Sequence, residues 1–460
     1  MLSLHDPAFG TASRRAFLRV GSLGLAGLAL PDLLFAKEKK LLKDRSVVFL
    51  FMHGGPPQHE LFDPKLDAPS GVRSATGEIP TSLPGVTFGG TMHGLAKRAH
   101  RLAVVRSFAT GDGNHDIKPV VGRFSADANL GSLYARVAGS NRPGTGMPTN
   151  LALFPRAVDE AAQPENNNFG RFASTGAAGG AYAPFVPGAG GPSQGDLRLN
   201  IARARLDDRR GLLADVDALR RRLDATGELE GLAGYQEQAF DTILGGIADA
   251  FDLSREDAKT VARYDTAPLV HPDKISKKWN NHKNYRDHGQ TLGKLMLMAR
   301  RLCERGAGFV TVTTNFVWDF HADRNNATLT EGMEYVARPF DHAVSAFLDD
   351  VEARGLSDKI LLVCCGEMGR TPKINDRGGR DHWGRLAPLI LAGGGLKVGQ
   401  VIGQSDAQGG EPAGDPVTIP HLNATIMHSL VDRGEVRLME SIPQAARDAI
   451  VAGSTIPGLV

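Results

Sequence analysis

The sequence predicts an α/β protein with a central, mostly parallel sheet between two layers of helices. Two observations support this. Short apolar runs rich in β-branched residues recur along the chain, and longer stretches with helical periodicity separate them. Near-continuous apolar strands indicate a sheet that is covered on both faces. Strands that alternate with helices favour a doubly wound, mostly parallel arrangement.

The predicted strands are short and apolar. They are separated by more than 20 residues in most cases, which leaves room for helical crossovers between parallel neighbours. The runs lie at residues 46–52, 102–108, 309–314, 360–365 and 388–393.

Helices are expected where apolar residues recur every three to four positions. The strongest candidate ends just before Gly306, a typical stop signal. The predicted helices lie at residues 288–305, 333–353 and 421–433. The segment 201–263 is rich in Arg, Leu and Asp without a strand signal, so we expect a helical insertion that caps the sheet. The Gly/Pro/Ala-rich stretch 175–195 indicates a loop.

The cysteine pattern favours buried thiols over a disulfide framework. Cys303 lies in the helical pattern, whereas Cys364 and Cys365 are neighbours in a predicted strand. Side chains alternate along a strand, so Cys364 and Cys365 are expected on opposite faces of the sheet.

Composition sets broad limits on function. The chain has 460 residues, 42% of them hydrophobic and 23% charged, which is ordinary for a globular protein. Its net charge is only +2 and it has no long basic run, so nucleic acid is not expected as a partner. The oligomeric state stays open.

The N-terminus carries an export pattern. Residues 13–20 read SRRAFLRV, and an apolar stretch and then KEKK follow. A twin Arg before a mildly apolar segment is typical of Tat signals, and the segment is short of the ~20 apolar residues of a membrane-spanning helix. We therefore expect a Tat signal peptide at 1–36, cleaved near Ala36, and a single domain at 37–460. The Tat translocase would be a partner during export, and the location would be periplasmic or extracellular. An uncleaved anchor is the alternative.

Polar clusters follow four of the predicted strands. In open α/β sheets, ligands bind outside the carboxyl ends of strands, so the clusters are expected to meet at one edge. Carboxylates and imidazoles gathered there indicate a divalent metal site or an acid/base site. Taken singly, such residues are more often turn or surface residues, and His53 and His59 alone are expected at the surface. The clusters are HGGPPQHELFDPK (53–65), ATGDGNHDIKP (109–119), NFVWDFHAD (315–323) and GEMGRTPKINDRGGRDHWGR (366–385).

The arginines of the last cluster have two interpretations. Arg370, Arg380 and Arg385 could clamp a phosphate or sulfate group, because guanidinium matches its oxygens bidentately. Beside a metal, this is a phosphoryl- or sulfuryl-transfer arrangement. Alternatively, the arginines tie down a long loop by donating to backbone carbonyls.

Several motifs in order resemble one bacterial family. After the twin Arg come GGPPQHELFDPKLDAP, HGQTLGKLMLMARRLCERGAGFVTV, WDFHAD, RGLSDKILLVCCGEMGRTPKIN, GRDHW and LILAGGGLKVGQVIG. Together they resemble a large Tat-exported, sulfatase-like family of unknown function that is placed in the alkaline phosphatase superfamily. The resemblance spans about 45 to 435 and is most specific from Arg354 to Gly403. It implies an alkaline-phosphatase-like fold with a metal site at the strand ends.

The resemblance also implies a set of site residues. One or two divalent ions (Zn, Ca, Mg or Mn) would be bound by Glu60, Asp319, His321, Glu367 and His382. His115 lies in the segment that resembles the helix start carrying the superfamily nucleophile. The chain departs from the pattern in lacking Cys-x-Pro-x-Arg, Ser-x-Pro-x-Arg and an Asp-Ser-Ala nucleophile motif, and Glu60 stands where the family usually has Asp.

The sequence therefore predicts an exported, metal-dependent hydrolase of phosphate or sulfate esters that does not use formylglycine. Its substrate would be a small-molecule or polysaccharide ester. Arg370 and Arg380 would hold the oxyanion, and His115 would act as acid/base or ligand. The missing nucleophile supports an alternative: a catalytically inactive exported binding or surface-assembly protein with the same fold. A metal-free isomerase is a weaker third hypothesis.

Overall fold

The computed structural model describes residues 5–6, 10–11, 41–188, 205 and 247–460. The twin-Arg segment and most of the predicted 201–263 insertion lie outside this part of the chain. At the N-terminus, β1 (His5–Asp6) pairs with β2 (Gly10–Thr11). Within the described ranges, no helix has the length and apolarity needed to cross a membrane.

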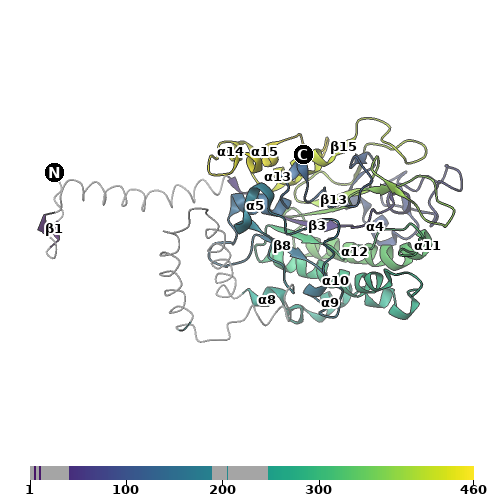
Figure 1. The fold of residues 1–460 in the computed structure, drawn as a ribbon, viewed down its shortest axis with the longest axis horizontal. Coiled ribbons are helices and arrows are strands. Elements are labelled where there is room, and N and C mark those ends of the chain that lie inside the picture. Colours follow the sequence, from purple (N-terminus) through teal and green to yellow (C-terminus); the bar gives the residue numbers. More distant parts are fainter. Residues whose placement is uncertain (1–4, 7–9, 12–40, 189–204, 206–246) are drawn as a thin grey trace.

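A seven-stranded sheet forms the centre of the molecule (Figure 1), in the order β14-β6-β13-β10-β3-β9-β8. Only β13 runs antiparallel to its two neighbours, and every other pair is parallel. The predicted mostly parallel sheet between helices is thus confirmed. In chain order the strands are β3 (Ser46–Phe51), β6 (Ala103–Val105), β8 (Asn150–Leu153), β9 (Phe309–Val312), β10 (Ile360–Cys365), β13 (Leu389–Gly393) and β14 (Gln400–Ile402).

The sequence analysis located the core strands but not the edge strands β8 and β14. Both are short, and their few residues carry little periodic signal. The predicted strand at 102–108 is divided in two. Its first part is β6. Its last residue, Phe108, begins β7 (Phe108–Ala109), which pairs with β15 (Val417–Thr418) in a separate small sheet.

Each face of the sheet packs against its own helices (Figure 1). One face, which includes Val48, Leu50 and Cys364, is covered by α4 (His93–Lys97), α10 (His282–Glu304) and α12 (Arg338–Ala353). The other face, which includes Phe49 and Cys365, is covered by α5 (Leu130–Ala138), α13 (Ile419–Leu430) and α15 (Gln444–Val451). Cys364 and Cys365 therefore lie on opposite faces, as predicted, and all three cysteines are free and buried.

The predicted helices form with shifted ends. Helix α10 starts six residues earlier than expected, at His282, and ends before Gly306, whose φ of 104° requires glycine. The helix expected from 333 begins as a π-helical turn, Met333–Ala337, before α12. Helix α13 begins earlier because Thr418 and His421 form a capping box and Pro420 occupies the first turn.

In the described part of the 201–263 insertion, α9 (Ala258–Tyr264) packs on α10, as does the neighbouring α8 (Ala248–Phe251). The predicted loop at 175–195 contains only short 3₁₀ turns as far as residue 188. Among the described residues, the remaining short α-helices and strands are α3 (Gln58–Leu61), β4 (Glu78–Pro80), β5 (Thr87–Gly89), α11 (Leu329–Gly332), β11 (Gly369–Arg370), β12 (His382–Trp383) and α14 (Arg433–Arg437).

Candidate metal centre

The loops that follow β3, β9 and β10 meet at the carboxyl edge of the sheet. The backbone N–H groups of Val317 and Trp318 both donate to His53 O, which joins two of the loops. Gly54 makes this approach possible. Its φ is 116°, and a Cβ atom there would lie 2.7 Å from Asp319 N. The HGG sequence thus brings the first cluster against Asp319.

Four predicted residues converge at this edge: His115, Asp319, His321 and His382. One ligand atom from each lies within 4.8 Å of all the others. Measured to Asp319 Oδ1, the Nε2 atoms of the histidines lie at 3.1 Å (His321), 3.6 Å (His115) and 3.7 Å (His382). Three segments that are distant in sequence, around residues 115, 319–321 and 382, therefore build one compact group.

Two of the histidines are oriented by carboxylates. His115 Nδ1 lies 3.0 Å from Glu367 Oε1, and His321 Nδ1 lies 2.8 Å from Asp381 Oδ1. If Nδ1–H donates to the carboxylate, the lone pair on Nε2 faces the centre of the group. This arrangement is typical of metal-binding histidines.

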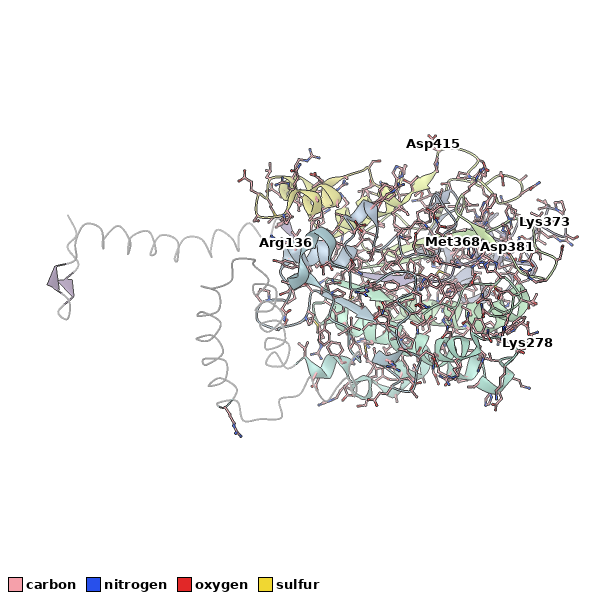
Figure 2. All side chains as sticks on the ribbon, in the orientation of Figure 1. Arg136, Lys278, Met368, Lys373, Asp381 and Asp415 are labelled. Carbon is pink, nitrogen blue, oxygen red and sulfur yellow. The ribbon has the colours of Figure 1, made fainter. Side chains whose placement is uncertain are left out.

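His382 completes the group with an unsatisfied atom. Among the residues that the structure describes, its buried Nε2 has no hydrogen-bond partner, although the side chain is 33% exposed overall. His382 belongs to β12, which pairs with β11 and so places it opposite Arg370. Asp381, which precedes His382, lies toward one end of the molecule, and Arg136 on α5 lies toward the other end (Figure 2). A buried nitrogen without a partner needs an explanation, and a cation would supply one.

The spacing of the group fits a four-coordinate ion. Metal–ligand bonds of about 2.0–2.1 Å in a tetrahedron put the ligand atoms roughly 3.3 Å apart. The three distances to Asp319 Oδ1, from 3.1 to 3.7 Å, bracket that value. Three imidazole nitrogens and one carboxylate oxygen suit Zn²⁺ better than Ca²⁺ or Mg²⁺, which prefer oxygen ligands.

The pKa shifts reflect the same convergence. Burial opposes ionisation of Asp319, but Arg370, His321 and His382 outweigh it and hold its pKa well below the usual range. Burial disfavours the charged form of His321, but Asp319 and Asp381 raise its pKa overall. Burial and the neighbouring cations lower the pKa of His115 to about 3. His321 Nε2 also lies 3.3 Å from Arg370 Nη1, so a neutral His321 can accept from the guanidinium. A protonated His321 would instead donate to Asp319 Oδ1, and a bound metal ion would lie between those two atoms.

Arg370 is fully buried and its donors are committed. Its Nη2 lies 2.5 Å from Asp319 Oδ1 and also donates to Gly54 O. Nε donates to Gly55 O at 2.8 Å, and Nη1 donates to Arg380 O at 3.1 Å. The predicted oxyanion role is not supported by this geometry, because Arg370 instead neutralises Asp319 and holds the 54–55 backbone.

Glu367 lies directly behind His115 rather than in the four-residue group. Its oxygens accept the Gly54 N–H at 3.0 and 3.2 Å, and Oε1 faces His115 Nδ1. Complete burial raises the pKa of Glu367 to about 7. The structure thus gives this predicted ligand the position of a residue that orients a ligand.

Glu60 and Arg380, both predicted for the site, instead pair with each other. Both side chains are fully buried, and Arg380 Nη2 lies 3.0 Å from Glu60 Oε1. The same Nη2 also donates to the backbone carbonyls of residues 72 and 73, and Nη1 donates to those of residues 371 and 372. Arg380 therefore ties down the long loop, the alternative raised for these arginines, and neither residue joins the four-residue group. Arg385 pairs with Glu411 at the surface.

The prediction that His53 and His59 lie at the surface is wrong, because the two residues are only 1% and 0% exposed. The His53 ring lies among phenylalanines, and neither of its nitrogens has a hydrogen-bond partner in the described part of the chain. Burial lowers its pKa to about 4. The HGG turn buries His53, and no pattern in the sequence marks the surrounding aromatic residues.

An aromatic wall beside His115 was not predicted from the sequence. Phe316 and Phe169 stack with ring centroids 4.7 Å apart, and lie 4.6 and 5.1 Å from the His115 ring. Phe316 lies three residues before Asp319 and could have been suspected. Phe169 comes from a segment without periodic signal.

A comparison with protein-family models assigns the chain to a family. Residues 44–435 match the model of a family described as "Protein of unknown function (DUF1501)". The chain belongs to this family. The matched range agrees with the span of about 45 to 435 over which the motifs resemble a family of unknown function. A comparison with curated proteins gives no match.

Solved structures give distant likenesses to this DUF1501 protein. A sulfatase from Pseudoalteromonas sp. is 12% identical, with a TM-score of 0.36 over 93% of this chain and 75% of that one. A phosphonate monoester hydrolase of Agrobacterium radiobacter is 10% identical (0.30; 85% and 74%). An alkaline phosphatase from the Antarctic bacterium TAB5 is also 10% identical (0.27; 78% and 94%). At such scores the likeness decides nothing about the activity of this chain.

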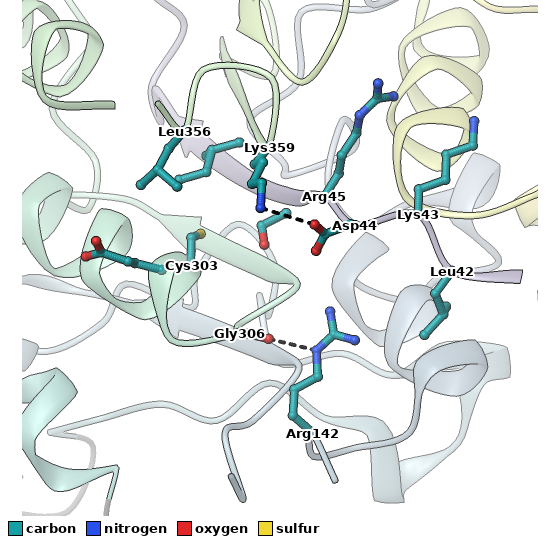
Figure 3. Close-up of a pocket in the computed structure, with 12 residues that line it drawn as sticks. Leu42, Lys43, Asp44, Arg45, Arg142, Cys303, Gly306, Leu356 and Lys359 are labelled. Atoms are coloured by element: carbon teal, nitrogen blue, oxygen red, sulfur yellow. Dashed lines mark hydrogen bonds and ion pairs between the residues drawn. The ribbon is translucent and has the colours of Figure 1, made fainter. Parts of the chain in front are cut away.

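A cavity of about 640 Å³ lies at the opposite end of the DUF1501 sheet (Figure 3). It is lined by residues at the amino ends of β3 and β10 and at the end of α10. Lys359 pairs with Asp44 at 3.3 Å, and Arg142 Nε donates to Gly306 O at 2.9 Å. The lining contains none of the predicted site residues, so the chemistry is assigned to the carboxyl edge.

Proposed function

We propose that His115, Asp319, His321 and His382 bind one divalent ion, most consistently Zn²⁺, and that the protein hydrolyses phosphate or sulfate esters. The observation that supports this best is the convergence of three Nε2 atoms on Asp319 Oδ1, with His382 Nε2 buried and unpartnered. The family resemblance to the alkaline phosphatase superfamily supports the reaction class.

A bound divalent ion would polarise the ester oxygen and lower the pKa of a water molecule to ~7. This would compensate for the nucleophile that the sequence lacks. The protein residues supply the rest of the site. Glu367 and Asp381 fix the ring orientation of His115 and His321, so that both Nε2 atoms face the same point. Arg370 offsets the charge of Asp319 in a buried place.

The exposure of the group defines where the substrate would arrive. Asp319 is only 7% exposed and His115 12%, whereas His382 is 33% exposed. An ester would therefore approach from the side of β12. The phenylalanine wall of Phe169 and Phe316 covers His115 from another side and limits water there.

The first test is elemental analysis of protein purified without chelator, followed by an ester panel. Near-stoichiometric zinc, and loss of both zinc and hydrolysis in His382→Ala with the fold retained, are the expected results. The matched control is His100→Ala, an exposed histidine outside the group, which should keep both. Full zinc content in His382→Ala would show that the site is misplaced.

We also propose that the protein is exported through the Tat pathway to the periplasm or beyond. The support is the SRRAFLRV stretch and the short apolar segment after it. Residues 1–40 fused to a reporter should direct its export, and Arg14→Lys with Arg15→Lys should stop it. Export of the doubly substituted fusion would remove the Tat assignment.

One observation favours the second candidate, an exported binding or surface-assembly protein without catalysis. Arg370 already gives Asp319 a positive partner at 2.5 Å, which is part of what a metal ion would provide. Protein that binds no zinc, manganese, calcium or magnesium after incubation with each ion would favour this function over hydrolysis.

A further inference from the structure

A cavity of about 820 Å³ adjoins the candidate metal centre. Its lining comes from the loop that carries His115, including Asp112, Asp116 and Lys118, and from the segment that contains Phe169 and Arg171. The size lies within the range of roughly 300–1,000 Å³ that is usual for ligand sites.

The cavity shares two walls with the metal centre. Phe169 lines the cavity, and its ring also lies 5.1 Å from the ring of His115. The loop between Asp112 and His115 packs on the other side against His382, because a Cβ atom at Gly113 would lie 3.1 Å from His382 Cβ. A ligand in the cavity would therefore lie next to two of the proposed metal ligands.

The charges that line the cavity balance. Three carboxylates, Asp112, Asp116 and Asp127, face three cations, Lys118, Arg123 and Arg171. Lys118 is engaged by Asp112 and Asp116, at 3.0 Å each. A net-neutral lining does not select a strongly charged ligand, since it attracts neither sign.

The free donors and acceptors suit hydroxyl groups. Within the described part of the chain, the guanidinium groups of Arg123 and Arg171 make no hydrogen bond or ion pair, and both residues are exposed. Asp112 is 54% exposed, so it keeps accepting capacity beside its bond to Lys118. A hydroxyl both donates and accepts, so it pairs with guanidinium and carboxylate alike.

Apolar rings complete the lining. Phe124 lies under the Arg123 guanidinium at 4.5 Å, and Phe169 is held in place by stacking on Phe316. A sugar ring presents apolar C–H groups to aromatic rings and hydroxyl groups to charged side chains. We propose that the cavity binds a sugar residue. Combined with the proposed function, on which this step rests, the ester substrate is then a carbohydrate ester.

The test is calorimetric or saturation-transfer NMR titration with neutral disaccharides: maltose, cellobiose, lactose and chitobiose. The intact protein should bind at least one of them saturably. Phe169→Ala and Arg171→Ala should each weaken that binding by about tenfold or more, from loss of a ring contact or a donor. Arg171 is exposed, so its variant should fold even if Phe169→Ala does not.

Two controls separate this proposal from the hydrolase. Lys373→Ala, an exposed cation outside the cavity, should bind sugar as the intact protein does. His382→Ala should lose the metal and still bind the disaccharide. Sugar binding by intact protein that takes up none of the divalent metals would sink the hydrolase and keep the sugar site. No saturable binding to the intact protein, or unchanged binding in both cavity variants, would overturn the sugar site whatever the metal content.

Discussion

Two buried arginine–carboxylate pairs lie in the same part of the molecule, and they differ in what surrounds the carboxylate. Arg380 pairs with Glu60 and Arg370 pairs with Asp319, and both arginines also donate to backbone carbonyls. Around Glu60, the further hydrogen-bond partners among the described residues are all donors: Ser74 Oγ, the N–H groups of Ala75 and Thr76, and Thr76 Oγ1. Around Asp319, Asn326 Nδ2 donates to Oδ2 at 2.8 Å, and three imidazole Nε2 atoms converge on Oδ1.

This difference shows that buried charge alone does not identify a functional site. Glu60 is saturated by donors, so it needs no other ligand and holds the loop in place. Asp319 faces nitrogens whose other ring atom already binds a carboxylate in two cases. A cation bound among these atoms would satisfy the converging lone pairs, and this distinguishes the second pair as the candidate site.

Replacing the carboxylate of each pair with its amide should remove bound metal in one pair and not in the other. Asp319→Asn removes the single anionic ligand, so metal content by elemental analysis should fall to background. Glu60→Gln, the matched control, should retain the metal content of the intact protein. Equal metal loss in both variants would mean that the two pairs do not differ in function.

The largest loss of stability is expected for Glu60→Gln. It leaves the fully buried Arg380 without its counter-ion, which typically costs about 3–5 kcal/mol in the free energy of unfolding. Urea denaturation of the metal-free protein measures this. Glu334→Ala, which breaks the exposed Arg338–Glu334 pair, should change the free energy by less than about 1 kcal/mol. Similar small losses in both would make the buried pair energetically unimportant.

Glu367, behind His115, should produce a pH dependence of stability. Burial raises the pKa of Glu367 from 4.5 to about 7, so the folded state holds this proton more tightly than the unfolded state. The resulting stability is complete below pH 4.5 and is lost as the pH rises through 7, by up to about 3 kcal/mol. Chelator-treated protein unfolded in urea at pH 5 and pH 8 should show this loss relative to Glu367→Gln. A constant difference between the two proteins across that range would contradict the assignment.

The smallest expected effect concerns orientation. Asp381 is 52% exposed and contacts the Nδ1 atom of His321. Asp381→Asn should lower metal affinity by about 10–100-fold without abolishing binding. Competition with a chromophoric chelator measures the change. Asp376→Asn, at an exposed position in the same loop, is the matched control and should match the intact protein.

The sequence predicted the scaffold better than the individual roles. Strand and helix periodicity located the core strands and the main helices, and the rule of carboxyl strand ends correctly brought His115, Asp319, His321 and His382 together. It could not separate Glu60 from the site, because the partners of Glu60 come from residues 74–76, where no motif stands out. Nor could it show that Arg380 faces carbonyls, since that depends on how a long loop folds back.

The four proposed ligands come from segments far apart in the chain, and His115 and His382 are separated by 267 positions (382 − 115). Contacts of such long range form slowly, because loop closure must precede them. Metal uptake would then report that the whole chain has completed folding. A nascent chain that has not yet reached β12 would hold three of the four groups and would lack the histidine on the exposed side.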